Sequence, residues 1–464
     1  MQNIIVRLNE IELKKFKNVE YGKIYLNKEI DLDKTDIIGI YGQNGSGKTA
    51  VIEAVDILKN ILLGKELPAD IVKYININSE YSDLKFNIYI ENIKEKTDNK
   101  LKIEYYIRLS KINESEAYIS KEKITYSSFA EDKWSFKKVL VEYVEENITF
   151  GTKEKNSSLH QADLKNNITL KVAKELAKEK KTSYIFNQYI INLVTSLRSI
   201  NKKLWKDTYN IILSLQSYAK TDLYVIKNNH SGAISMNIAI PMVFRVKEKE
   251  KYITTGSLIV DLENKSYVDN NYITVLETVI EQINKVIVKV VPGLNIAIEK
   301  YGTQINKEGK EETIMELVSI KNNARIPLKY ESEGIKKIIS IMSIIIFVYN
   351  NPSACLVVDE LDSGIYEFLL GEILQILNES GKGQLIFTSH NLRPLEVLNK
   401  KQLYFTTVNP KNRYITLGSI KATNNIRDVY LRSVNLGGQK EPIYDETNNL
   451  EIARALRLAG GVTL

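Results

Sequence analysis

The sequence has few of the features on which secreted and membrane proteins depend. It contains one cysteine, Cys355, in 464 residues, so no disulfide can form within the chain, and a single thiol is typical of a reducing compartment. The most apolar stretch, residues 335–349, is interrupted by lysines and serines and falls short of the roughly 18 apolar residues that a spanning helix needs. The first residues lack the charged and then apolar layout of a signal peptide. We therefore expect a cytoplasmic protein that does not cross a membrane.

Histidine is also scarce, with three in the chain. His160 and His230 lie in polar stretches where no role in binding is expected, and cysteine and histidine form no cluster with the spacing of a zinc site. Basic residues exceed acidic ones by 64 to 57, which permits contact with nucleic acid without requiring it. Apolar residues make up 44% of the chain, enough for packed cores, and the length allows two or three domains.

One motif organises the chain, and it fits the phosphate-binding loop G-x-x-x-x-G-K-[ST]. Residues 36–41 before it form a short apolar run that predicts a buried strand, and residues 50–63 after it have helical spacing. Strand, loop and helix in this order are the context that the motif requires. The loop residues are Gly42, Gln43, Asn44, Gly45, Ser46, Gly47, Lys48 and Thr49.

The residue types of this loop suit a bound triphosphate. Glycine allows positive φ angles and a close approach of the backbone to an anion. The loop amides and the positive end of the helix dipole then face the phosphates. Lys48 supplies a charge to the outer phosphates, and Thr49 offers a hydroxyl to Mg²⁺. We therefore expect ATP and Mg²⁺ as cofactors.

Two carboxylates and a histidine follow later strands. Asp359 and Glu360 come directly after the apolar run at residues 355–358, and His390 follows the run at residues 384–388. A helix is expected between the two runs, so they form a parallel strand–helix–strand unit with the site at its carboxyl edge. Asp359 is expected to hold Mg²⁺, Glu360 to polarise the attacking water, and His390 to hydrogen-bond the γ-phosphate or that water.

A further anion site is possible at the start of the apolar helix expected over residues 336–348. Ser332, Glu333 and Gly334 precede it, and the serine and glycine can expose amides at its N-terminus. The alternative is an ordinary helix cap.

The remaining patterns give a coarse outline. Strands are expected in residues 4–30 and, as an antiparallel sheet, in 82–145. Residues 163–220 and 270–291 have helical spacing. Short strands are expected in 222–268, and a hairpin in 294–321 whose turn holds residues 306–309.

Taken together, these motifs resemble the ATP-binding-cassette (ABC) ATPases of the SMC, RecF and OLD type, and small AAA-type relatives that carry similar Ser-Glu-Gly and Asp-Glu segments. The resemblance implies an α/β ABC-ATPase head formed by the two terminal segments, with a mixed α+β insertion between them. The implied parts are 1–110 with the phosphate-binding loop, 111–320 as the insertion, and 321–464 with the signature, the acids and the switch histidine. In that family Ser332 and Gly334 would reach the γ-phosphate held by a partner copy, Glu360 would be the catalytic base, and His390 the switch histidine. Asp362 would belong to a loop that contacts the partner.

The chain also resembles stand-alone ATPases of bacterial anti-phage defence systems. That resemblance implies an ATP-hydrolysing sensor that forms a homodimer or larger oligomer and controls a separate effector, a nuclease or a toxin. DNA or a phage protein would be the trigger. The alternative is a DNA-repair ATPase of the RecF or SMC kind that clamps DNA, and a non-hydrolysing scaffold is disfavoured because Lys48, Asp359 and Glu360 are intact.

The sequence departs from this family in three places. Tyr366 occupies a region where many relatives have a histidine, and the residues after 400 carry no acid cluster of the toprim nuclease type. A glutamine over Mg²⁺ is also expected, and Gln161 and Gln188 are the nearest candidates.

Overall fold

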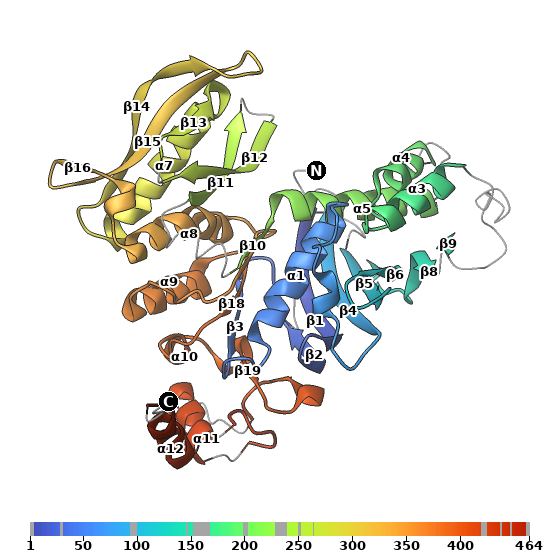
Figure 1. The fold of residues 1–464 in the computed structure, drawn as a ribbon. Coiled ribbons are helices and arrows are strands. Elements are labelled where there is room, and N and C mark those ends of the chain that lie inside the picture. The colour runs from blue at the N-terminus through green and yellow to red at the C-terminus, as the bar shows by residue number, and fades with distance from the viewer. Residues whose placement is uncertain are drawn as a thin grey trace.

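The protein is described here by a computed structural model. It describes residues 4–27, 31–92, 100–144, 147–151, 168–197, 203–227, 239–248, 252–262, 264–418, 425–436, 439–445 and 448–460. Two large sheets and the helix α1 (Lys48–Leu62) between them form the centre of the molecule (Figure 1). A smaller lobe and a C-terminal helical segment flank this centre, so the α/β class predicted from the sequence is confirmed.

The first large sheet has six strands, and its five longer strands are parallel. In spatial order the strands are β10 (Leu223–Ile226), β17 (Cys355–Val358), β18 (Gln384–Thr388), β3 (Asp36–Tyr41), β19 (Leu403–Thr406) and β20 (Tyr414–Ile415). β3 pairs with β18 from Asp36↔Gln384 onward, so segments more than 300 residues apart form one sheet. This pairing unites the two terminal segments in one sheet.

The second large sheet is an antiparallel meander, as predicted for residues 82–145. Its strands are β2 (Val19–Tyr25), β1 (Ile4–Phe16), β4 (Tyr81–Asn92), β5 (Lys100–Lys111), β6 (Ala117–Ala130), β8 (Lys138–Val144) and β9 (Asn147–Phe150), with β7 (Lys133–Trp134) beside β6. The division expected at residues 110 and 111 falls at the end of β5, inside this continuous sheet.

Three buried polar side chains link the two sheets where β1 passes the start of β3. Arg7 is 1% exposed, and its guanidinium pairs with Asp36 Oδ2 at 2.9 Å. Gln384 exchanges two hydrogen bonds with the backbone of Leu8 and also donates to Asp36 at 3.0 Å. Because both terminal nitrogens of Arg7 and the amide of Gln384 have partners, most of the cost of burying these side chains is compensated.

Helix α1 is apolar on most sides because a sheet covers each of its flanks. Ten of its 15 residues are buried, and its core cluster includes Ile38 and Val357 of the parallel sheet and Leu13 and Leu84 of the antiparallel one. A helix of this kind belongs inside a domain. The opposite face of the parallel sheet is covered by α8 (Glu333–Asn350) and α9 (Glu367–Ser380).

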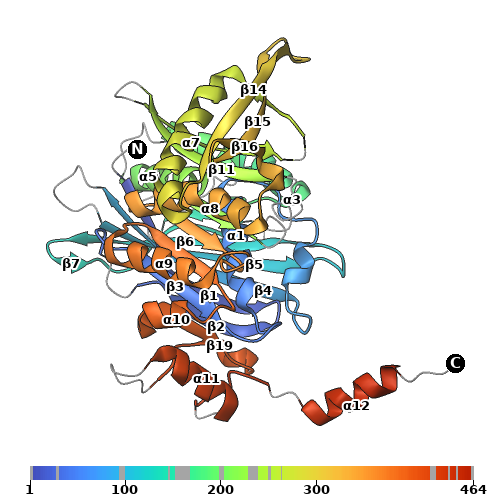
Figure 2. The same cartoon turned by 90° about the vertical axis from the view of Figure 1, so that its left-hand side faces the viewer.

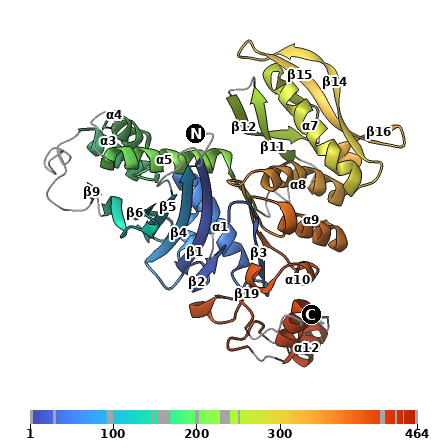
Figure 3. The ribbon, with the colours of Figure 1, turned by 180° about the vertical axis from the view of Figure 1, so that it is seen from behind.

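Further helices pack beside the β5, β6 and β9 end of the antiparallel sheet. The view from behind shows this arrangement (Figure 3). These helices are α3 (Ile168–Glu179), α4 (Gln188–Leu197) and α5 (Lys203–Thr221). Helices were predicted for residues 163–220, and the described part of that range is helical apart from the connection between α3 and α4. The short helix η1 (Ile71–Tyr74) connects α1 to β4.

The smaller lobe lies on α8 (Figure 1). It contains the pair β11 (Ala239–Glu248) and β12 (Tyr252–Asp261), the helix α7 (Asn270–Val290), and a sheet of β13 (Ser266–Asp269), β14 (Asn295–Ile305), β15 (Glu311–Lys321) and β16 (Ala324–Pro327). The predicted helix over 270–291 is confirmed. The hairpin is confirmed too, and the amide of Asn306 donates to the carbonyl of Lys310 across its turn at 2.8 Å.

After β18, the described residues of the C-terminal segment form α-helices joined by shorter elements. The helices are α10 (Pro394–Val397), α11 (Ile426–Leu436) and α12 (Asn449–Gly460). α12 has no buried residue and extends away from the body of the protein (Figure 2). Among the helices of the described ranges, none has the length and apolar character needed to span a bilayer.

Candidate functional site

The loop after β3 has the conformation that a phosphate-binding loop requires. Gly42, Gly45 and Gly47 have φ angles of 151°, 74° and 97°, a region that glycine enters without strain. Gly42 also admits a neighbouring strand, because a Cβ there would lie 1.6 Å from Thr406 Oγ1. Helix α1 begins at Lys48, directly after Gly47, so its N-terminus faces the loop.

Lys48 is held inside the loop. Its ammonium donates to the carbonyl of Gly42 at 2.8 Å and to that of Gln43 at 3.1 Å, and its side chain is 7% exposed. Burial lowers the pKa of this ammonium, and the neighbouring carboxylates, Asp359 foremost, oppose the shift. The charge is therefore placed among acids and loop carbonyls at the centre of the site.

The C-terminal part of the chain braces the loop from outside. The Tyr414 hydroxyl donates to the carbonyl of Gly47 at 2.7 Å, and the hydroxyls of Ser46 and Thr406 lie 2.5 Å apart. Gln43 exchanges two hydrogen bonds with the backbone of Asp445. The loop geometry therefore depends on residues that lie more than 350 positions away.

The two acids after β17 are oriented by one threonine of β18. Thr388 Oγ1 donates to Asp359 Oδ1 at 2.6 Å and accepts from the amide of Glu360 at 2.7 Å. Glu360 has a φ of 50°, which costs about 1–2 kcal/mol for a residue other than glycine. Backbone strain of this kind is typical of functional sites.

The residues present fit a magnesium ion. Asp359 is 1% exposed, yet its Oδ2 atom is buried without a hydrogen-bond partner. Thr49 Oγ1 lies 3.4 Å from the other oxygen, Oδ1. A hydroxyl and one carboxylate, completed by water and phosphate, are the ligands that Mg²⁺ takes in such sites. No cluster of three or more carboxylate, histidine or cysteine side chains occurs in the described ranges, so a metal bound entirely by such side chains is not indicated there.

His390 enters the site at the carboxyl end of β18. Its side chain is exposed, while its backbone amide donates to Asp362 Oδ2 at 3.2 Å, as does that of Asn391 at 3.1 Å. The loop after Glu360 and the loop carrying His390 are therefore fastened to each other.

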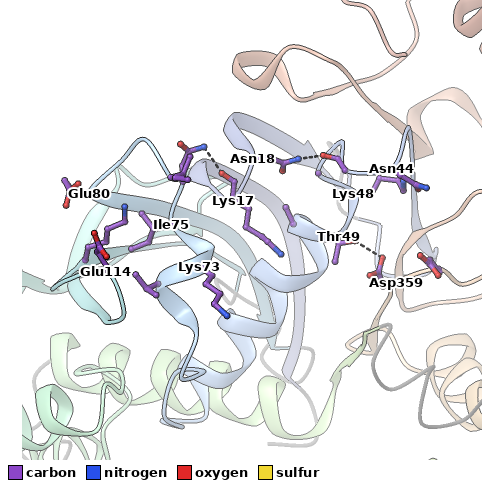
Figure 4. A pocket seen from close by; sticks show the side chains of 18 of the residues that line it. Lys17, Asn18, Asn44, Lys48, Thr49, Lys73, Ile75, Glu80, Glu114 and Asp359 are labelled. Carbon is purple, nitrogen blue, oxygen red and sulfur yellow. Dashed lines mark hydrogen bonds between the residues drawn. The ribbon is translucent and has the colours of Figure 1, made fainter. Parts of the chain in front are cut away.

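These elements surround a cavity of about 1300 Å³ (Figure 4). Among its lining residues are five of the residues singled out for chemistry, namely Lys48, Thr49, Asp359, Glu360 and His390. Asn44, Gly45 and Gly47 of the loop line it as well, whereas Gly42, Gln43 and Ser46 are not among its lining residues. The cavity continues past Lys17 and η1 to Lys111 and Glu114 at the corner between β5 and β6.

The segment Ser332-Glu333-Gly334 lies elsewhere. None of its residues lines the cavity, and Ser332 and Glu333 are exposed. Ser332 caps α8 by accepting a hydrogen bond from the amide of Ile335 at 3.3 Å. A Cβ on Gly334 would lie 2.4 Å from the carbonyl oxygen of Gly364, so α8 packs directly on the loop that follows Glu360.

No glutamine lines the cavity among the residues that the structure describes. Gln161, like His160 and His230, lies outside the described residues, and Gln188 is an exposed residue of α4 that donates to Asn192. Gln188 does not line the cavity.

Sequence reasoning missed Lys227, which follows β10. β10 pairs with β17 so that Ile226 lies opposite Val358, which places Lys227 beside Asp359 at the same sheet edge. Its ammonium pairs with Asp56 of α1 at 2.6 Å. The signal in the sequence is a short apolar run, residues 223–226, that ends in a lysine. The run itself does not indicate which strand lies beside it.

With this geometry in place, the comparison with known families is informative. The family described as "AAA domain, putative AbiEii toxin, Type IV TA system" matches residues 37–396. The chain belongs to this AAA family. The matched range extends from β3 into α10, so it contains the phosphate-binding loop, the two acids after β17 and His390. No curated protein matches the chain.

Solved structures similar to this AAA protein include heads of SMC proteins and RecF. The SMC head domain from Thermotoga maritima is 13% identical, with a TM-score of 0.38 over 89% of this chain and 100% of that one. The Smc head domain with a coiled coil and joint from Pyrococcus yayanosii is 12% identical, with a TM-score of 0.43 over 92% and 100%. RecF bound to ATP is 13% identical, with a TM-score of 0.36 over 89% and 100%.

Proposed function

We propose that this protein is a cytoplasmic ATP hydrolase that requires Mg²⁺. The observation that carries the proposal is that a phosphate-binding loop, two strand-end acids and a histidine line one cavity. The Oδ2 atom of Asp359 supports it, because a buried carboxylate oxygen that accepts no hydrogen bond from the described residues is available to ligate a cation.

Each residue has a distinct task in this proposal. The amides of the glycine loop and the Lys48 ammonium bind the phosphate oxygens. Thr49 and Asp359 would hold Mg²⁺, which when bound neutralises charge that develops on those oxygens. The Glu360 carboxylate accepts the proton of the attacking water, and His390 donates a hydrogen bond to the outer phosphate.

Replacing Glu360 tests the hydrolase. Glu360→Gln should keep ATP binding and lower turnover by about 10²–10⁴-fold, because the amide cannot accept the proton. Glu367→Gln, at an exposed position of α9 away from the cavity, is the matched control and should keep normal turnover. Unchanged hydrolysis in Glu360→Gln would reject the assignment of the base.

A second copy is proposed to complete the site. Ser332, Glu333 and Gly334 are placed outside the cavity of their own chain, and the first two are exposed. In an ATP-bound homodimer, or in a larger oligomer, they would reach the outer phosphate held by the neighbour. Ser332→Arg and Lys48→Ala should each abolish hydrolysis, and mixing the two variants should restore part of it because one site of a mixed dimer is intact. No recovery in the mixture would count against the trans arrangement.

In the cell, the protein is proposed to act as a sensor switch in anti-phage defence that controls a separate effector, a nuclease or toxin. The family description, which mentions a toxin–antitoxin system, supports this role, with DNA or a phage protein as the trigger. Purification together with the products of neighbouring genes tests it, and a stable complex with one of them is expected. Salt-sensitive DNA binding without any protein partner would instead favour a repair ATPase that clamps DNA. The formal net charge of +7 is compatible with this alternative.

A further inference from the structure

A second buried lysine faces the carboxylates of the site from helix α8. Lys337 is 4% exposed, and it is not among the residues that line the nucleotide cavity. It follows Gly334 by three positions, so the two residues lie on the same face of the helix. Because Gly334 packs on Gly364, this face of α8 is turned toward the loop that follows Glu360.

Three carboxylates act on the Lys337 ammonium, namely those of Asp362, Glu360 and Asp359. Burial lowers the pKa of this ammonium, and the three carboxylates oppose the shift, Asp362 foremost. The same three acids act on the ammonium of Lys48, with Asp359 foremost. Two buried ammonium groups therefore share one cluster of acids, one from the phosphate-binding loop and one from α8.

Asp362 connects this cluster to the loop that carries His390. Its Oδ2 atom accepts hydrogen bonds from the backbone amides of His390 and Asn391 at 3.2 and 3.1 Å. Its Oδ1 atom is buried and accepts no hydrogen bond from the described residues. A buried carboxylate is costly unless its charge is compensated, and Lys337 supplies positive charge from α8.

We propose that Lys337 is a positioning residue for ATP hydrolysis. Its charge holds Asp362 and, through Asp362, the loops that carry Glu360 and His390. Lys337 lies one turn from Gly334, so it also ties the start of α8 to the acids of its own chain. This role rests on the proposed hydrolysis, and it affects turnover rather than the binding of ATP.

Removal of the Lys337 charge tests the role. Lys337→Met should lower kcat by about 10- to 100-fold, as loss of an orienting partner commonly does. The affinity of a single chain for ATP should stay close to normal, since Lys48 and the glycine loop are unchanged. Lys337→Arg keeps the charge and should recover most of kcat. Lys337→Gln, which is also uncharged, repeats the test if Lys337→Met does not fold.

Lys336→Met is the matched control. Lys336 is 2% exposed and belongs to the same helix, but residues two positions apart do not share a helix face, so it is not aligned with Gly334. Its replacement removes an equally buried lysine and should keep most of the turnover. An equal loss of kcat in Lys336→Met and Lys337→Met would mean that any buried lysine of α8 has this effect, and would overturn the proposal.

A double variant tests whether Lys337 acts through Asp362. Residues that act as one unit have non-additive effects. Lys337→Met combined with Asp362→Asn should therefore turn over ATP about as fast as the slower of the two single variants. If the two losses multiply in the double variant, Lys337 and Asp362 act independently and the proposed route is wrong.

Mixing of variants separates this role from a general disturbance of α8. Lys337 serves the acids of its own chain, as Lys48 does, so a mixture of Lys337→Met and Lys48→Ala should stay inactive. The mixture of Ser332→Arg and Lys48→Ala, which is expected to recover activity, is the reference. Recovery of the Lys337→Met mixture to the reference level would place the effect in the partner's site and overturn the proposal.

One set of turnover measurements keeps this proposal apart from the proposed function. Normal kcat in Lys337→Met, together with lost turnover in Glu360→Gln, would overturn the role of Lys337 and leave the hydrolase intact. A chain that hydrolyses no ATP under any condition would reject the proposed function and this role with it.

Discussion

Thr388 is hydrogen-bonded to both acids that follow β17. Its hydroxyl donates to Asp359 Oδ1 at 2.6 Å and accepts from the backbone amide of Glu360 at 2.7 Å. The threonine belongs to β18, which pairs in parallel with β17. A single hydroxyl therefore fixes the carboxylate expected to hold the metal and the backbone that carries the expected base. Partners of this kind orient metal ligands without touching the metal.

Thr388→Val is expected to lower ATP turnover by about 10–100-fold, because valine keeps the shape of threonine and loses both hydrogen bonds. The Mg²⁺ concentration needed for half-maximal turnover should rise, since Asp359 loses its orientation. Hydrolysis measured over a titration of Mg²⁺ checks both effects.

A matched control for this variant is Thr407→Val. Thr407 is 1% exposed and is hydrogen-bonded to the carbonyls of Asn409 and Asn412, away from the cavity. Thr388→Ser should recover most of the activity because it restores the hydroxyl. An unchanged Mg²⁺ requirement in Thr388→Val would remove the positioning role.

Lys227→Met is expected to raise the KM for Mg-ATP by about 3- to 10-fold, with a smaller effect on kcat. Lys227 lies beside Asp359 in register and pairs with Asp56 at 2.6 Å. Loss of its charge leaves the acids of α1 less compensated, and they then oppose the phosphates. Steady-state kinetics at fixed free Mg²⁺ measure the effect.

Asp56→Asn distinguishes the effect of the Lys227 charge from the effect of the Lys227–Asp56 ion pair. This variant removes the partner and keeps the ammonium, so its KM should stay close to that of the unchanged protein. If Lys227→Met and Asp56→Asn raise KM equally, the ion pair and not the lysine charge is responsible.

Gly334→Ala is expected to lower ATP turnover several-fold while leaving ATP binding by a single chain intact. The added Cβ would lie 2.4 Å from Gly364 O, so α8 must move away from the loop that follows Glu360. Hydrolysis and nucleotide binding should be measured in parallel. Gly418→Ala is the control, because a Cβ at Gly418 meets no atom within 4 Å. Equal turnover in Gly334→Ala and Gly418→Ala would contradict the expected effect.

Glu122→Ala should lower the free energy of unfolding by about 3 kcal/mol or more, since it leaves several buried donors without an acceptor. The Glu122 carboxylate is fully buried and accepts hydrogen bonds from Tyr105 and Ser183 and from the amides of Tyr184 and Ile185. It joins the antiparallel sheet to the segment between α3 and α4.

Urea denaturation measures this loss. Tyr105→Phe removes one donor and keeps the acceptor, so it should cost about 1 kcal/mol. If Glu122→Ala costs no more than Tyr105→Phe, the network does not fasten the helices to the sheet.

The local parts of the site could be predicted because each is encoded by a short contiguous pattern. The glycine loop between a strand and a helix was found in this way, and so were the acids after β17 and the cap at Ser332. The meeting of the glycine loop and the two acids in one cavity was inferred from the rule that parallel strands present their carboxyl ends at one edge, whereas Ser332 lies outside that cavity. The glutamine expected over Mg²⁺ could not be located, because a single glutamine carries no local pattern that distinguishes it from the others in the chain.

The sequence by itself determined which segments are strands and helices and which residues carry charge at their ends, since hydrophobic spacing and glycine placement act over a few residues. Only the tertiary structure decided that β18 lies between β3 and β17, that β10 brings Lys227 beside Asp359, and that Gly334 touches Gly364. The order of strands in a sheet results from pairing between segments hundreds of residues apart, and alternation along a strand specifies the face that is buried but not the neighbouring strand.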